Sequence, residues 1–236
     1  MANRTTQLFL AHTQPGFETI ASGEIGALEG ASVRETRVLP GKNGMVLFSY
    51  RGDLADLFEL RTIEDLFAVV ASMREMAPTF AGLKQFEEQV RRASTIEPAL
   101  QLARQAKPGR GGHGRLRFRV VARQAGQTSF RRVDAQIGVE KAIASRSDHR
   151  WRREDEGALE FWLTLWQPRN RPAGDALLAL RLSDERMRHR EYKIEHLPAS
   201  LRPSAAAAMV WLTDPREDDV FLDPMCGAGT ILIERA

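Results

Sequence analysis

The first seventy residues alternate between short apolar runs, which favour strands, and segments with apolar residues at helical spacing. The first helical segment begins at Pro15, a favourable first helical residue, and the second begins after Asp53, a favourable N-cap. The order β-α-β-β-α-β is that of a ferredoxin-like unit, so we expect a small α+β domain at residues 1–69. The predicted elements span 6–13, 15–28, 32–39, 44–50, 53–63 and 65–73.

The middle of the chain combines amphipathic helices with alternating strands. In the segment 115–124, Leu116, Phe118 and Val120 point one way and the intervening arginines the other, which predicts a half-buried strand. The glycines of 108–114 predict a loop. Helices are predicted at 83–94, 97–107 and 133–146, and a further strand at 158–167.

The last third predicts a strand at 175–183, a helix at 201–213 that begins near Pro203, and a short strand at 218–223. The stretch PMCGAGT follows this short strand, and the helical pattern resumes in ILIERA. Strand, glycine loop and helix N-terminus are therefore expected in succession.

This glycine loop has the chemistry of a ligand site. Gly227 and Gly229 permit positive φ and a close approach of the backbone to a ligand. A helix beginning near Thr230 directs free N–H groups into the same space, and Asp223 can accept hydrogen bonds there. A tight turn without a ligand explains the two glycines equally well. Leu232 stands where the dinucleotide-binding fingerprint requires a third glycine, which argues against a nicotinamide cofactor.

The composition of the 236 residues is ordinary, with 43% hydrophobic and 28% charged residues, a net charge of +3 and a pI near 9.3. The single cysteine, Cys226, excludes an internal disulfide and a cysteine-based zinc site. The five histidines show no metal-binding spacing, so no metal site is expected. No apolar run approaches the length of a membrane span or resembles a signal peptide, so we expect a cytoplasmic protein.

Positive charge is concentrated in residues 107–153, where thirteen Lys or Arg face three acids. This stretch carries +10 and the rest of the chain −7, an asymmetry typical of a surface that binds nucleic-acid phosphates. Phe130 could stack on a base beside this charge. A solvated basic face with no specific partner is the alternative. The candidate RNA-binding residues are Lys107, Arg110, Arg123, Arg131, Arg132 and Lys141.

The stretch LDPMCGAGTILIERA resembles motif I of class I S-adenosylmethionine-dependent methyltransferases that modify RNA. The preceding segment, 182–209, resembles the one that helps to close over the cofactor in these enzymes, and 70–170 resembles a THUMP RNA-binding domain. The resemblance implies an α+β fold with a ferredoxin-like domain at 1–69 and a THUMP domain (α/β) at 70–170. The linker and the first elements of a Rossmann-like methyltransferase domain would occupy 171–236.

The resemblance also implies roles for individual residues. Asp223 corresponds to the acid that contacts the methionine amino group of S-adenosylmethionine. Leu201, Arg202 and Pro203 lie where the upstream segment reaches the carboxylate end of the cofactor. The loop that wraps the methionine moiety corresponds to Pro224, Cys226, Gly227, Ala228, Gly229 and Thr230.

The implied reaction is transfer of a methyl group to N2 of guanine in RNA, with tRNA favoured and 23S rRNA as the alternative. The Asn- or Asp-Pro-Pro-aromatic catalytic motif of the family does not occur in the sequence, so no catalytic residue is assigned. We therefore expect the N-terminal portion of a longer enzyme, truncated in its catalytic domain and inactive by itself. Two other hypotheses stay open: a stand-alone RNA-binding module, and a different nucleotide-binding enzyme that uses the 226–230 loop.

Overall fold

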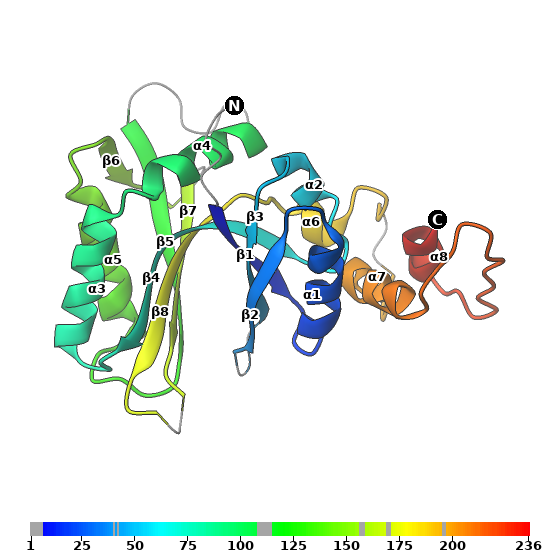
Figure 1. Ribbon diagram of the computed structural model, residues 1–236, viewed down its shortest axis with the longest axis horizontal. Helices are drawn as coiled ribbons and strands as arrows, with labels where there is room; N and C mark the ends of the chain where they lie inside the picture. The colour runs from blue at the N-terminus through cyan, green and yellow to red at the C-terminus, as the bar shows by residue number, and fades with distance from the viewer. Residues whose placement is uncertain are drawn as a thin grey trace. The chain divides into compact units, whose positions relative to one another are not determined.

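The computed structural model describes residues 7–39, 41, 43–107, 115–155, 159–168, 171–194 and 197–236. The chain forms two compact units (Figure 1). One consists of Met1–Leu66 together with Ser183–Ala236, and the other of Phe67–Leu182. The C-terminal segment therefore packs with the N-terminal elements. The predicted strand at 175–183 forms, but it belongs to the second unit as β8 (Gly174–Arg181).

The first unit begins with the predicted element order, and strands β2 and β3 form the expected antiparallel hairpin. Strand β1 pairs with the other edge of β3, also antiparallel. The Asp53 side chain accepts a hydrogen bond from the N–H of Ala55 at 3.0 Å, which confirms it as an N-cap. The elements are β1 (Gln7–Thr13), α1 (Glu18–Ala27), β2 (Ser32–Val38), β3 (Gly44–Tyr50), α2 (Leu54–Phe58), α6 (Arg186–His189), α7 (Pro203–Leu212) and α8 (Thr230–Arg235).

Apolar packing stabilises the N-terminal part of this unit and joins it to α7. Phe9 and Phe48 stack with their ring centroids 5.6 Å apart in the core. Helix α7 begins at Pro203, as predicted, and buries most of its alanines. Its Trp211 lies against Gly23 of α1, where a Cβ atom would approach the indole nitrogen to 3.3 Å. A small residue in α1 thus allows α7 to pack closely against it.

The second unit is a sheet with strand order β4-β8-β7-β5-β6, in which β5 pairs in parallel with β6 and β7. Strand β8 pairs antiparallel with β4 and β7. Helix α5 contacts α3 and packs on β5, as Figure 1 shows. The remaining elements are β4 (Asp65–Met76), α3 (Phe80–Arg92), α4 (Ile96–Ala106), β5 (Arg115–Ala125), α5 (Arg132–Ala144), β6 (Arg150–Arg153) and β7 (Leu159–Trp166).

Strand β5 has the two faces that its sequence predicts. Leu116, Phe118 and Val120 are at most 3% exposed. Phe118 lies edge-to-face with Trp151 of β6 and Phe161 of β7, at centroid distances of 5.6 and 6.2 Å. The other face of β5 therefore carries the arginines of the alternating pattern.

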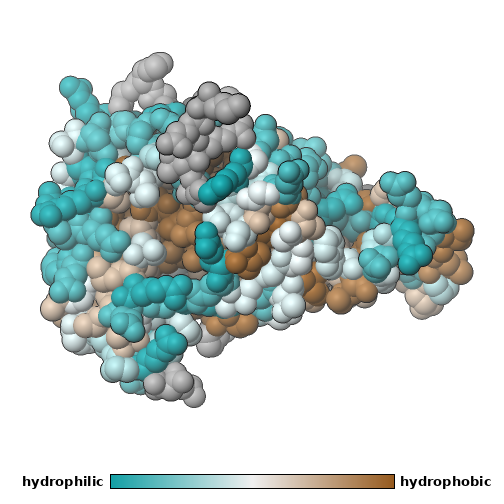
Figure 2. All heavy atoms as spheres, in the orientation of Figure 1, coloured by the Kyte–Doolittle hydropathy of each residue, from teal (hydrophilic) through white to brown (hydrophobic). Residues whose placement is uncertain are grey.

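The predicted strand at 218–223 does not form. These residues are irregular, and the side chains of Val220 and Leu222 are 98% and 82% exposed. A strand is stabilised by hydrogen bonds and side-chain packing with its neighbours, and no strand within the described residues pairs with this stretch. In Figure 2, brown atoms of exposed apolar residues are visible along the segment that holds α7 and α8.

Candidate functional site

The loop at 223–230 has a defined backbone. Gly227 and Gly229 both adopt left-handed conformations, with φ of +53° and +70°, as the sequence predicts. Asp223 Oδ1 accepts a hydrogen bond from the N–H of Met225 at 3.0 Å, and the N–H of Gly229 donates to the carbonyl of Cys226 at 2.8 Å. Two glycines and one aspartate turn thus form a compact loop that leads into α8.

The loop leaves room and hydrogen-bonding capacity for a ligand. A Cβ atom at Gly229 would meet nothing within 4 Å, and one at Gly227 would meet only the Met225 carbonyl oxygen, at 4.0 Å. Among the described residues, no group bonds the second carboxylate oxygen of Asp223, and the Cys226 thiol is exposed and free. These residues fit a ligand that brings an ammonium or hydroxyl group to the Asp223 carboxylate.

Helix α8 is short but firmly anchored within the first unit. The Glu234 side chain is fully buried, and its carboxylate accepts a hydrogen bond from the Tyr192 hydroxyl. It also forms ion pairs with Arg61 and Arg190, each at 3.5 Å. Arg61 Nη1 donates in addition to the Glu234 carbonyl at 3.1 Å. Polar contacts from Arg61, Arg190 and Tyr192 therefore hold α8, the helix that follows the loop, in place.

The Tyr192–Glu234 bond predicts a pH-dependent contribution to stability. Burial, and next the hydrogen bond to Glu234 and its negative charge, raise the pKa of Tyr192 above its usual value near 10. Its contribution is therefore fully present below pH 10 and is lost as the pH rises beyond it. The variant Tyr192→Phe should be less stable at pH 8 by about 1–2 kcal/mol. In urea unfolding from pH 8 to 11, this difference should shrink above pH 10. A difference that is independent of pH would contradict the assignment.

The segment upstream of the loop is occupied by contacts within the first unit. Arg202 Nη1 forms an ion pair with the buried Glu64 at 3.3 Å, while the arginine side chain stays 65% exposed. The Leu201 carbonyl accepts a hydrogen bond from Lys193 Nζ at 2.6 Å, and Pro203 begins α7. The predicted contact of Leu201, Arg202 and Pro203 with a cofactor stays a prediction, since Glu64 already offsets the charge of Arg202.

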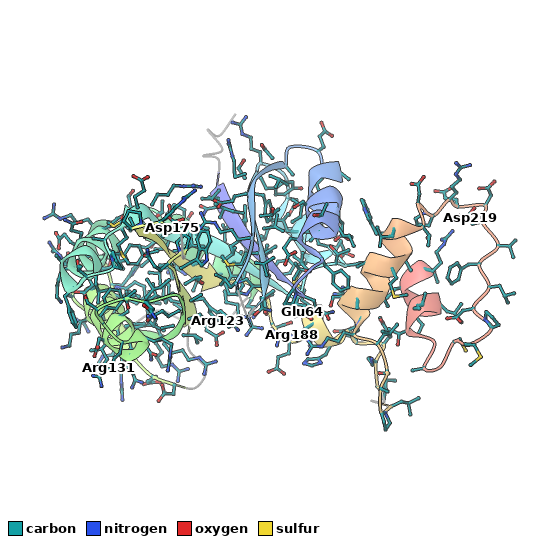
Figure 3. All side chains as sticks on the ribbon, turned by 90° about the horizontal axis from the view of Figure 1, so that it is seen from below. Glu64, Arg123, Arg131, Asp175, Arg188 and Asp219 are labelled. Atoms are coloured by element: carbon teal, nitrogen blue, oxygen red, sulfur yellow. The ribbon has the colours of Figure 1, made fainter. Side chains whose placement is uncertain are left out.

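The structure distributes the candidate RNA-binding residues over different elements. Arg131, Arg132 and Lys141 belong to α5 or its N-cap, and Lys107 ends α4, whereas Arg123 lies on β5 with its guanidinium 4.0 Å from the Trp162 ring centroid. Figure 3 shows Arg123 and Arg131 apart from each other. Arg110 lies outside the described residues.

Two of these side chains have local partners, and for Arg131 the partner offsets its charge. Arg131 forms an ion pair with Asp134, at 2.9 Å between Nη2 and Oδ1. This bond, and next the backbone N–H of Arg131, hold the pKa of Asp134 below its usual value. Arg132 Nη1 donates to the carbonyl of Ala122 at 3.2 Å. Lys141 has no such partner among the described residues.

The proposed base-stacking role of Phe130 is wrong. Its side chain is 3% exposed and packs edge-on against Phe80 of α3, with a centroid distance of 5.9 Å. The apolar ring is buried in preference to remaining in water beside the arginines, because burying it is favourable by about 1.5–3 kcal/mol.

In the part of the chain that the structure describes, no helix is long and apolar enough to cross a membrane. The His, Cys, Asp and Glu side chains of the described residues form no group of three or more that could hold a metal ion.

Comparison with known proteins points to one class of enzyme. Residues 190–236 match the family described as "RMKL-like, methyltransferase domain". The chain is 26% identical over 235 residues to the ribosomal RNA large subunit methyltransferase K/L of Syntrophotalea carbinolica. Over 47 residues it is 47% identical to the tRNA (guanine(6)-N2)-methyltransferase of Methanocaldococcus jannaschii. The mixed α/β fold is similar to the crystal structure of TrmN from Thermus thermophilus, with a TM-score of 0.64 and 23% identity.

These matches cover the relatives only in part. The first alignment covers 97% of this chain and 29% of the relative, and the second covers 20% and 12%. The structural match covers 97% of this chain and 60% of TrmN. The chain is thus similar to RNA methyltransferases over nearly its whole length, and residues 190–236, which hold the glycine loop, match the methyltransferase domain of the RMKL-like family.

Proposed function

We propose that this chain is the RNA-binding and cofactor-loop portion of an RNA methyltransferase that uses S-adenosylmethionine. Its target is N2 of a guanine, in tRNA in preference to 23S rRNA. The observation that carries the proposal is the 223–230 loop, in which two left-handed glycines lie beside an aspartate with an unused carboxylate oxygen. This loop lies in the segment that matches a methyltransferase-domain family.

The residues of the loop have distinct roles in this proposal. The free oxygen of Asp223 accepts a hydrogen bond from the ammonium of the methionine moiety, and its other oxygen stays bonded to Met225, which orients the carboxylate. Gly227 and Gly229 let the backbone approach the same moiety without a side chain in the way. When bound, the cofactor supplies a methyl group on a positively charged sulfur. The chain contributes binding and orientation, and positioning is the main requirement for such a transfer.

The two units have net charges of opposite sign, which supports the proposal that one unit binds RNA and the other holds the cofactor loop. Residues 67–182 hold 21 Lys or Arg and 12 Asp or Glu, a net charge of +9, whereas the rest of the chain carries −6. A basic unit attracts RNA phosphates and releases their counterions. We interpret this unit as the THUMP-like RNA-binding domain and the strands and helices that precede it as a ferredoxin-like domain. RNA affinity then comes from the second unit, whereas the 223–230 loop belongs to the first.

Methyl transfer tests the proposal directly. The protein expressed from its complete reading frame is incubated with methyl-labelled S-adenosylmethionine and with unmodified tRNA or 23S rRNA. We expect label in N2-methylguanine. Asp223→Ala should weaken cofactor binding by about 10- to 100-fold, because it removes a charge-assisted hydrogen bond. Asp218→Ala, which removes an exposed acid from the same segment, is the matched control.

Each outcome of this experiment has a clear meaning. Label in neither RNA, with a protein that is folded, would overturn the enzyme proposal. The stand-alone RNA-binding module, which the charge of residues 67–182 favours, would then remain. Equal affinity of Asp223→Ala and the parent would mean that the loop does not hold the methionine moiety.

A further inference from the structure

One face of the second unit's sheet carries a row of arginines, which we call the arginine face. Helix α5 packs on β5, and the apolar side chains of β5 are buried. The alternate residues of the strand point to the opposite face. In the parallel ladder between β5 and β6, Arg115 lies opposite Arg150 and Arg117 opposite Arg152. The arginine face consists of Arg115, Arg117, Arg119 and Arg123 of β5 and Arg150 and Arg152 of β6.

Two carboxylates lie among these arginines and leave most of the charge uncompensated. Glu154 bridges Arg117 and Arg152, at 3.2 and 3.0 Å. Glu160 pairs with Arg119 and with Arg181 of β8. Desolvation opposes the ionised form of Glu160, but hydrogen bonds from Trp162 and Arg119 outweigh it and lower the pKa. Glu160 is therefore a fixed negative charge at neutral pH.

Arg115 and Arg150 differ from the other arginines of this face. Both are exposed, and among the described residues neither side chain has a hydrogen bond or an ion pair. Like charges on neighbouring strands repel each other, and here no described acid offsets the repulsion. A bound anion between the two guanidinium groups would relieve it. Strand β6 is the last strand of the sheet, so Arg150 lies at the sheet edge and Arg115 on the strand next to it.

The spacing of the arginines suits a polyanion. Alternate residues of a strand are about 6.6 Å apart, and neighbouring strands lie about 4.8 Å apart. A row of cations at these intervals follows the phosphates of an extended nucleic-acid strand without reading its bases. Trp162 lies in the same face but is 7% exposed and is covered by Arg123, so it offers no stacking platform.

We propose that the arginine face binds the sugar–phosphate backbone of RNA, with Arg115 and Arg150 as its principal phosphate contacts. The helix α5 side, with Arg131 and Lys141, is then secondary, because Asp134 already offsets Arg131. The inference takes RNA as the partner from the proposed function and adds the surface.

A pair of matched variants tests the surface. Arg115→Gln with Arg150→Gln removes two charges from the arginine face, and Arg131→Gln with Lys141→Gln removes two charges from α5. Binding of the whole chain to an unmodified tRNA pool and to 23S rRNA is measured from 50 to 200 mM salt. For the arginine-face variant, the slope of log affinity against log salt should become shallower by about 1.4 to 1.8, as expected for two lost phosphate contacts. The α5 variant should lose less of the slope than the arginine-face variant does, because Asp134 already offsets Arg131.

The outcomes separate this inference from the proposed function. A parent that binds neither RNA contradicts the RNA-binding part of the proposed function. The parent could bind RNA with an affinity that falls steeply with salt, and the arginine-face variant could keep the same slope. This result would overturn the assignment of the surface and leave the proposed function intact. Equal losses in the two variants would indicate diffuse attraction to the whole unit and would also overturn it. Far-UV circular dichroism of both variants checks that each one is folded.

Discussion

Gly126→Ala should lower the free energy of unfolding of the second unit by about 2–4 kcal/mol. Gly126 follows the last residue of β5 and has φ of +96°. A Cβ atom there would lie 2.3 Å from the carbonyl oxygen of Gln167 and 2.6 Å from its Cβ. Gln167 is itself bonded to the strand, since its N–H donates to the Ala125 carbonyl at 2.8 Å. The substitution therefore adds backbone strain and displaces the end of β7 from β5.

Gly16 is a matched control because it separates strain from collision. It has the same φ of +96°, but a Cβ atom there would meet nothing within 4 Å. Gly16→Ala should therefore show only the cost of the left-handed conformation, about 1 kcal/mol. If Gly126→Ala lowers the free energy of unfolding by no more than Gly16→Ala does, Gln167 does not lie as close to residue 126 as described.

Tryptophan fluorescence can assign the loss to the correct unit. Three of the four tryptophans, Trp151, Trp162 and Trp166, belong to the second unit, and Trp211 belongs to the first. In a Trp211→Phe background, fluorescence during urea unfolding reports the second unit alone, and circular dichroism reports both. Gly126→Ala should shift the fluorescence transition, whereas Gly16→Ala should leave it in place.

Local periodicity was sufficient to predict most of the elements. The alternation of Leu116, Phe118 and Val120 predicts β5 because the sheet buries one of its faces. The left-handed glycines of the 223–230 loop were equally predictable, since residue type alone permits that conformation. Asp53 was recognisable as an N-cap for the same local reason.

Features that depend on pairing with residues far away in the chain are not predictable from local sequence. Strand β6 has four residues, three of them arginine, and is too short to show a period by itself, so periodicity alone does not predict a role for Arg150 and Arg152. An alternating reading of RWRR beside RLRFR could have found them. The 218–223 run has the right composition for a strand but lacks a pairing neighbour among the described residues.

The net charge of the stretch 107–153 overstates the positive charge of the surface, because acids outside this stretch pair with its arginines. The stretch 107–153 ends just before Glu154, and Glu160 lies opposite Arg119, 41 residues away in the chain. The register of β7 with β5 places Glu160 beside Arg119, and the hydrogen bond from the Glu154 N–H to the Phe118 carbonyl holds Glu154 next to the end of β6. Unpaired cations, not total charge, therefore define the candidate RNA surface.

Glu234→Ala should lower the free energy of unfolding of the C-terminal segment by about 3–5 kcal/mol, the range for loss of one partner from a buried ion pair. The Glu234 side chain is fully buried, with Arg61, Arg190 and Tyr192 around it. Its removal leaves the Arg190 guanidinium, only 13% exposed, without this counter-charge. Because α8 follows the glycine loop directly, we expect loss of order in both.

Hydrogen exchange is the measurement that locates this effect. In Glu234→Ala, amides of 223–236 should exchange faster by a factor of 100 or more, as follows from about 3 kcal/mol of local opening, while those of β5 and β7 keep their protection. Glu191→Ala is the matched control, because it removes an acid from an exposed pair with Arg186, whose side chains are 74% and 77% exposed. Such pairs contribute about 0–1 kcal/mol. Similar exchange in the two variants would show that Glu234 does not hold the loop in place.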